Sequence, residues 1–168
     1  MNTQLPRNII RFVILVLIQV LILNNIQFTR LHLNPLVYTL FVLLLPFNTP
    51  LWLQLAASFL LGLTVDIFSD TLGMHSSATV LLAFLRPFVL EIIAPREGYE
   101  VGKSPQLSTF GLGWFLKYSL ILIVAHHTVY FLLDAFDIHF IHILLLKIGL
   151  TTIFSTLIIV ISQFFVFK

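Results

Sequence analysis

The sequence predicts an all-α integral membrane protein with six transmembrane helices packed into a single compact bundle that spans residues 1–168. Of the 168 residues, 59% are hydrophobic and only 10% are charged, whereas a soluble domain carries about 25% charged residues. The apolar runs are continuous rather than alternating, which favours helices over strands. Because a spanning helix needs about 20 residues, the chain has room for roughly six helices with short connections.

Six apolar runs define the expected spans, at about residues 9–27, 35–47, 50–68, 72–93, 110–133 and 138–167. The first follows Arg7 and Arg11, and we expect it to be retained because no signal-peptide cleavage motif follows it. The second is short and lies between Pro35 and Pro46. Proline at both ends predicts a helix that starts at Pro35 and kinks or stops near Pro46.

The distribution of Lys and Arg predicts the orientation. With the N-terminus inside, the inner side carries seven basic residues, which are Arg7, Arg11, Arg86, Arg96, Lys103, Lys117 and Lys168. The outer side carries Arg30 and Lys147. We therefore expect cytoplasmic N- and C-termini and a cytoplasmic loop at residues 94–108. The basic residues form no stripe that would indicate nucleic-acid binding, and the absence of cysteine excludes disulfides and cysteine-based metal sites.

Four small or acidic residues recur every four positions in the third span and its exit: Ser58, Gly62, Asp66 and Asp70. This spacing places them on one helix stripe, and Ser58-x-x-x-Gly62 is typical of close helix contacts in membranes. One interpretation of Asp66 is a buried cap that holds the first N–H groups of the fourth helix across a tight turn ending at Gly73. The other interpretations are a cation, proton or ligand site and a contact with the helix of a partner protein.

Histidines and aspartates gather toward the expected outer end of the bundle. They could form one His/Asp cluster from His75, His126, His127, His139 and His142 with Asp66, Asp70, Asp134 and Asp137. Both residue types are good transition-metal ligands. However, the chain has no H-E-x-x-H motif, and histidines near helix ends are common without a ligand. We therefore expect no metal site and no cofactor.

The loop at residues 94–108 is the largest expected soluble surface, so it is the expected docking site for a cytosolic partner. Its candidate contact residues are Arg96, Glu97 and Tyr99. Arg86 and Glu91 interrupt the fourth span near its inner end, where they would anchor the helix at the interface or extend the docking edge. No nucleophile motif such as G-x-S-x-G or S-x-x-K is present, and we expect no enzymatic activity.

The six-span layout and the stretch Gly62-Leu63-x-x-Asp66…Leu72-Gly73-x-His75 resemble the rod shape-determining protein MreD family. In that family the pattern joins the third and fourth spans, and Gly62, Asp66, Leu72 and Gly73 match its helix–turn–helix signature. The resemblance implies a protein of the bacterial inner (cytoplasmic) membrane that takes part in cell elongation. The implied partners are the bitopic protein MreC, the MreB filament, and RodA with its transpeptidase partner.

Two functions follow from the resemblance and the residues. The first is a non-enzymatic scaffold of the elongation complex that helps to organise peptidoglycan synthesis and cell shape. The MreD family is also similar in fold to the substrate-binding subunits of energy-coupling-factor vitamin transporters. The alternative is therefore a substrate-binding subunit of a small-molecule (vitamin or metal ion) transporter, with the outer His/Asp cluster lining a pocket.

Overall fold

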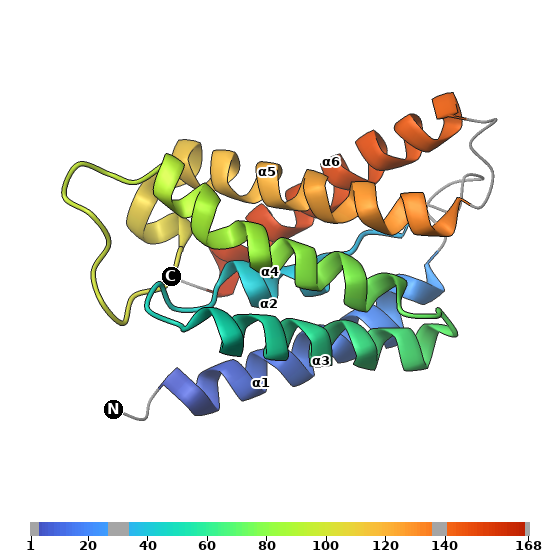
Figure 1. The fold of residues 1–168 in the computed structure, drawn as a ribbon, viewed down its shortest axis with the longest axis horizontal. Coiled ribbons are helices and arrows are strands. Elements are labelled where there is room, and N and C mark those ends of the chain that lie inside the picture. Colours follow the sequence, from blue (N-terminus) through green and yellow to red (C-terminus); the bar gives the residue numbers. More distant parts are fainter. Residues whose placement is uncertain (1–3, 27–33, 136–140, 167–168) are drawn as a thin grey trace.

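The computed structural model describes residues 4–26, 34–135 and 141–166, which are helical with short connections (Figure 1). The long helices are α1 (Gln4–Leu17, continued by a π-helical turn at Ile18–Ile22 and a 3-10 turn at Leu23–Asn25), α3 (Leu51–Ser69), α4 (Met74–Ile92), α5 (Leu107–Asp134) and α6 (Ile141–Val166). Between these turns and α3, the described residues 34–50 contain a 3-10 turn, η3 (Val37–Thr39), and the short helix α2 (Leu40–Leu43).

Among the described residues, five helical segments are long and apolar enough to cross a membrane: Leu5–Asn25, Leu51–Ser69, Met74–Ile92, Leu107–Asp134 and Ile141–Phe165. Their outer faces carry large apolar side chains such as Trp52 and Ile67, each more than 60% exposed. This surface suits a hydrocarbon solvent rather than water. The fold class is therefore that of a multi-pass helical membrane protein.

Of the six expected spans, the second differs most from the structure. A helix filling residues 35–47 is wrong: the helical part covers three residues of η3 and four of α2. That length rises only about 10–12 Å, against a hydrocarbon thickness of about 30 Å. The expectation of six transmembrane helices therefore becomes, among the described residues, five long helices and one short element. We call residues 34–47 the crossover segment.

The crossover segment connects opposite ends of the bundle. At its start, the C-terminal ends of α1 and α3 meet, since Asn24 donates to Ser69 Oγ across 2.8 Å. At its finish, Phe47 N donates to Lys103 O across 2.9 Å, in the loop between α4 and α5. In Figure 1, α1 and α3 run in the same direction and the crossover segment runs back in the opposite direction. The chain thus traverses the bundle a further time without a spanning helix.

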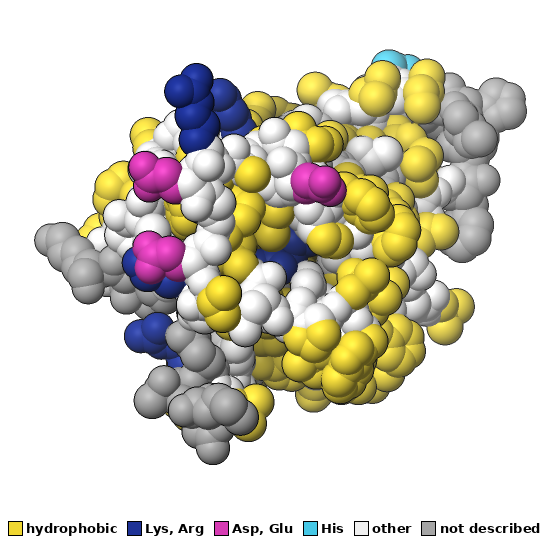
Figure 2. All heavy atoms as spheres, turned by 60° about the vertical axis from the view of Figure 1, so that its left-hand side comes forward, with side chains coloured by type: hydrophobic (Ala, Val, Ile, Leu, Met, Phe, Trp, Pro, Cys, Tyr) yellow, Lys and Arg dark blue, Asp and Glu magenta, His cyan; other side chains and the backbone are white. Residues whose placement is uncertain are grey.

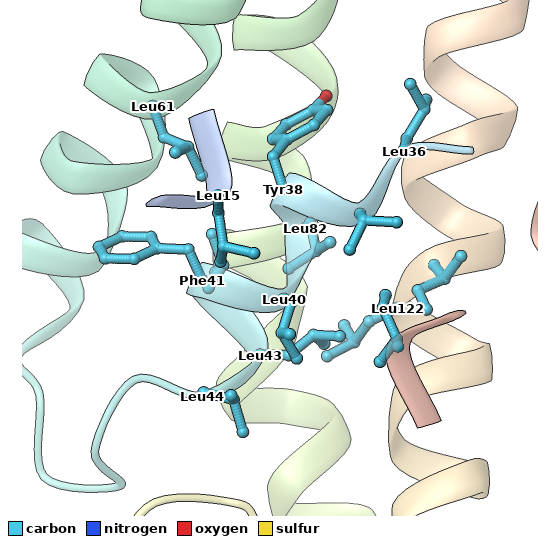
Figure 3. Packing of buried hydrophobic residues seen from close by; sticks show 14 of the residues in the cluster. Leu15, Leu36, Tyr38, Leu40, Phe41, Leu43, Leu44, Leu61, Leu82 and Leu122 are labelled. Atoms are coloured by element: carbon cyan, nitrogen blue, oxygen red, sulfur yellow. The ribbon is translucent and has the colours of Figure 1, made fainter. Parts of the chain in front are cut away.

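Burial explains how a short helix is tolerated at this depth. Residues 35–46 are all buried, and non-helical backbone occurs at membrane depth only where protein surrounds it. Figure 3 shows the side chains of Tyr38, Phe41 and Leu43 radiating from the crossover segment into the core. They pack among Leu15 of α1, Leu61 of α3, Leu82 of α4 and Leu122 of α5. The crossover segment is therefore the centre of the hydrophobic core.

The other helices lie close to the expected spans. The helices α3, α4, α5 and α6 pack as successive neighbours, and Pro87 lies within α4 without ending it. The helix α5 begins at Leu107, before the expected start at residue 110, and bends where Gly111 adopts a φ of 77°. Residues 138–140 and 167 of the expected last span lie outside the described residues.

Candidate functional site

The backbone groups at the start of the crossover segment are bound by side chains from α1 and α6. The buried side chain of Gln19 donates from Nε2 to Pro35 O across 3.0 Å and accepts from Val37 N across 2.9 Å. Ser155 Oγ accepts from Leu36 N across 2.9 Å. Since the first N–H groups of a helical turn have no helical acceptor, these side chains supply the missing partners.

The carbonyl groups at the other end of the crossover segment are bound in the same way. Tyr118 of α5 donates its hydroxyl to Leu43 O across 2.9 Å. Arg11 of α1 donates to Leu44 O across 3.1 Å. Arg86 of α4 donates to Leu45 O. Helix C-termini leave their last carbonyls unsatisfied, and here three helices supply the donors.

Arg86 is a fully buried cation at the centre of this second cluster. Its Nε donates to Tyr118 Oη and its Nη1 donates to Gln54 Oε1, each across 2.9 Å. The expectation that Arg86 anchors α4 at the membrane interface is therefore wrong: the side chain is 0% exposed. Neutral oxygens from α3, α5 and the crossover segment hold the guanidinium fork, because their geometry matches its fixed N–H directions. Glu91 is exposed at the end of α4.

The carboxylate of Asp66 binds the N-terminus of α4. Its Oδ1 accepts from His75 N across 3.0 Å, and its Oδ2 accepts from Ser76 N across 2.9 Å. The hydroxyls of Thr71 and Ser76 also donate to it. An acid at this position is favoured by both the free N–H groups and the helix dipole. The interpretation of Asp66 as a buried cap of the fourth helix is confirmed.

The small-residue stripe on α3 faces α4, as its spacing predicts. Ser58 and Gly62 are buried, and a Cβ atom at Gly62 would lie 2.6 Å from Ser76 N and 2.7 Å from His75 O. Real Cβ atoms essentially never make contacts that short, so glycine is what allows α3 to approach the start of α4. This close approach brings the Asp66 carboxylate within reach of the α4 N–H groups.

The turn between α3 and α4 also follows the sequence prediction in part. Asp70 and Gly73 both adopt left-handed backbone conformations, with φ of 53° and 80°, which Asp and Gly tolerate. Asp70 is exposed rather than continuing the buried stripe, because the helix ends at Ser69. Leu72 is 100% exposed, so it contributes a surface rather than a core contact.

The histidines that the structure describes do not form the single outer cluster that the sequence suggested. His75 Nδ1 and His126 Nε2 lie 2.8 and 2.9 Å from the Tyr38 hydroxyl, so this phenol joins α4 to α5 through the crossover segment. His127 instead bonds to Ile123 O and to Ser155 Oγ, at 2.8 and 3.1 Å. His142 and Asp134 are exposed, while His139 and Asp137 lie outside the described residues. Within the described chain, no three His, Cys, Asp or Glu residues are grouped as a metal site.

A polar hollow of about 520 Å³ opens at the same end of the bundle as the Asp66 turn. Its polar lining consists of Asn24, Asn25, Asn34, Ser69, Asp70, Thr71, His75 and Tyr130. Tyr38 lies 2.8 Å from Nδ1 of His75, and the same histidine lines the hollow. The ring of Tyr130 lies over His75 with centroids 4.6 Å apart. The arrangement could hold a small molecule with several hydrogen-bonding groups.

The loop expected at residues 94–108 occupies residues 93–106, and only part of it is available to a partner. Arg96 and Glu97 are exposed. Tyr99 instead folds inward: its hydroxyl donates to Leu90 O across 2.7 Å and its ring stacks on Phe47 at 4.2 Å. This burial raises the pKa of Tyr99 to about 12. Tyr99 therefore fixes the loop to the bundle and does not present a contact surface.

Sequence reasoning missed the polar residues that hold the crossover segment. Gln19, Gln54 and Tyr38 each lie inside an apolar run, and all three are buried. A polar side chain within a spanning helix is costly in lipid, so it usually faces protein. That signal could have identified Gln19 and Gln54 as interior residues, but it could not have named the atoms that they bind.

The geometry defines a helical membrane protein with two main polar features. Polar side chains from other helices bind the backbone of the central crossover segment, and a polar hollow opens at one end of the bundle. Comparisons with protein families, with curated proteins and with solved structures found no match for this chain.

Proposed function

We propose that the chain is a non-enzymatic scaffold of the bacterial cell-elongation complex, as its resemblance to the MreD family implies. In this role it lies in the inner membrane with both termini in the cytoplasm, binds MreC, and assembles with the MreB filament, RodA and its transpeptidase partner. It holds these proteins in place during peptidoglycan synthesis and so contributes to cell shape.

The observation that carries this proposal is a neutral apolar groove on the outside of the bundle. The groove encloses about 440 Å³ between α1 and α3. One wall is formed by Leu5, Ile9 and Phe12, the other by Leu53, Ala57 and Leu60, and Phe41 and Leu45 form the floor. None of the described residues that line it is basic or acidic. Such a surface fits the apolar transmembrane helix of a bitopic partner such as MreC.

The use of the interior polar groups also supports a scaffold. Asp66 holds α4, and Arg86 holds the crossover segment. Ionisable side chains inside membrane-spanning helices are by default candidates for a functional role. Both are committed to backbone groups of the fold, which suits a protein whose task is to present a rigid surface.

The charge distribution supports the proposed orientation. Basic and acidic side chains gather at the end of the bundle that carries the N-terminus and the loop at residues 93–106 (Figure 2). This end includes the exposed residues Arg7, Arg96 and Lys103. Because cytoplasmic ends are enriched in Lys and Arg, this distribution supports a cytoplasmic location for this end in the proposed role.

A tryptophan placed in the groove tests the scaffold proposal. Ala57 lines the groove, whereas the neighbouring Ala56 is exposed and does not line it. We expect the wild-type chain and A56W to recover co-expressed MreC from detergent extracts, and A57W to lose most of it. Equal abundance of the variants in the membrane is the control for folding. Failure of the wild-type chain to recover MreC, or equal recovery by A57W, would contradict the proposal.

The polar hollow favours a second candidate, the substrate-binding subunit of a vitamin or metal-ion transporter. The hollow is concave and lined mainly by polar residues that include His75, and these are features of a ligand site. A substrate that binds the folded state raises its unfolding temperature. If a panel of vitamins and divalent cations stabilises the wild-type chain but not Asn24→Leu, while MreC is not recovered, the transporter subunit replaces the scaffold.

A further inference from the structure

A second groove runs along the other side of α1 and differs from the first in its charge. It encloses about 370 Å³ between α1 and α6. The α1 wall carries Ile10, Ile14, Leu15 and Ile18, and the α6 wall carries Ile158 and Ser162. The crossover segment forms the floor with Val37, Leu40 and Leu44. Unlike the α1–α3 groove, this one also includes two basic residues, Arg7 and Arg11.

The two arginines lie together at one end of the groove. They are four residues apart on α1, so they share a helix face. Arg7 is exposed, and in the described part of the chain it makes no ion pair. Arg11 is partly buried and already donates to Leu44 O across 3.1 Å. Two guanidinium groups above an apolar channel present the charge that a phosphate group requires.

Arg7 also lines a small polar hollow of about 220 Å³ next to the groove. The other lining residues are Gly102, Lys103, Ser104, Gln106 and Thr109, from the loop between α4 and α5 and the start of α5. Arg7 is therefore the residue where an apolar channel and a polar, cationic hollow meet. This juxtaposition matches an amphipathic ligand with an anionic head.

The length of the groove matches one leaflet of a bilayer. From Arg7 to Ile18 the helix rises about 16 Å, which is roughly half of the ~30 Å hydrocarbon thickness. An acyl chain that starts at the level of Arg7 would reach the middle of the membrane beside Ile18.

We propose that the α1–α6 groove binds one anionic phospholipid. Arg7 and Arg11 hold its phosphate, the polar hollow receives its headgroup, and one acyl chain lies along Ile10, Ile14 and Ile18. Basic pockets between membrane helices are suited to anionic lipid headgroups. The lipid fills the space between the first and last helices, which the crossover segment separates. The site is independent of the proposed scaffold function and of the MreC groove.

The test measures thermal unfolding of the purified, delipidated full chain in detergent. Phosphatidylglycerol and phosphatidylcholine with the same acyl chains are titrated separately, and inorganic phosphate is a third arm. We expect saturable stabilisation by phosphatidylglycerol, with little by phosphatidylcholine or phosphate. R7Q is expected to weaken the apparent affinity for phosphatidylglycerol about fivefold, since each basic residue contributes about 1 kcal/mol.

Matched variants distinguish lipid binding in the groove from the general effects of removing a charge or adding a large side chain. I14W fills the groove and should abolish the stabilisation, whereas V13W, at an exposed neighbour outside the groove, should retain it. K117Q removes an exposed charge elsewhere and should also retain it. Equal stabilisation by the two lipids, stabilisation by phosphate equal to that by phosphatidylglycerol, or wild-type behaviour of both R7Q and I14W would overturn the proposal.

Discussion

Gln19 Oε1 accepts a hydrogen bond from Val37 N across 2.9 Å, deep in the bundle. This contact replaces the helical acceptor that Val37 lacks at the start of η3. Ser155, Tyr118 and Arg86 make the equivalent contacts with other backbone groups of the crossover segment. Side chains of α1, α4, α5 and α6 hydrogen-bond to its backbone directly. The α3 helix is connected to it indirectly, because Gln54 of α3 binds Arg86. The fold is thus organised around one short element whose polar backbone is satisfied by distant side chains.

Substitution of Gln19 by Leu tests that contact. The variant leaves Val37 N and Pro35 O without partners in a buried site, and we expect a loss of about 1–3 kcal/mol for each unsatisfied group. The matched control is Gln163→Leu, because Gln163 is also buried but its side chain has no hydrogen-bond partner among the described residues. Thermal unfolding in detergent should show a lower midpoint for Gln19→Leu alone. Equal midpoints for both variants would be inconsistent with the role of Gln19.

Arg86→Lys tests whether the guanidinium fork matters rather than the charge. Lysine keeps the charge, but its single ammonium group cannot place N–H donors where the guanidinium donates to Gln54, Tyr118 and Leu45. We expect a loss of about 2–3 kcal/mol in the free energy of unfolding. Arg96→Lys, in the exposed loop, should change stability by less than about 0.5 kcal/mol. Chemical denaturation of the purified variants measures both, and a neutral Arg86→Lys would argue against the network.

Asp66→Asn removes the charge that caps α4 while keeping the size of the side chain. An amide offers one acceptor in place of two carboxylate oxygens, so at least one of His75 N and Ser76 N loses its bond. We expect a loss of about 2 kcal/mol and lower abundance in the membrane. Asp70→Asn is the control, since Asp70 is exposed and Asn also tolerates its left-handed backbone. Normal abundance of Asp66→Asn would refute the capping role.

Gly62→Ala tests the close approach of α3 and α4. The added methyl group would lie 2.6 Å from Ser76 N, so the two helices must separate at the cost of about 1–3 kcal/mol. At Gly149 of α6 a Cβ atom would meet nothing within 4 Å, and Gly149→Ala should be neutral or slightly stabilising. Unfolding temperatures of the two alanine variants provide the comparison. A Gly62→Ala variant as stable as Gly149→Ala would show that the helices are not in tight contact.

The long helices could be predicted because the signal is local. An apolar run such as residues 51–69 satisfies its own backbone as a helix, so length and hydropathy are sufficient. The crossover segment has the same apolar composition, and the sequence prediction treated it in the same way. Its actual conformation depends on donors and acceptors at Gln19, Arg86 and Ser155, which are distant in sequence. Hydropathy contains no information about such partners.

The sequence predicted those parts of the candidate site whose position follows from the spacing of residues along a helix. The four-residue spacing of Ser58, Gly62 and Asp66 placed them on one face, and the turn residues placed the carboxylate near the next helix. Arg86 was misread because a basic residue near the end of a span usually reaches the interface. Its burial requires Gln54 and Tyr118 to converge from two other helices, which no local pattern indicates.

Cysteine labelling tests most directly whether the crossover segment carries the chain across the membrane. The chain contains no cysteine, and Asn25 and Asn48 are exposed on either side of the crossover segment. Single variants Asn25→Cys and Asn48→Cys are treated in intact cells with a membrane-impermeant maleimide. We expect Asn25→Cys to react from outside and Asn48→Cys to react only after the membrane is permeabilised. Reaction of both from the same side would contradict it.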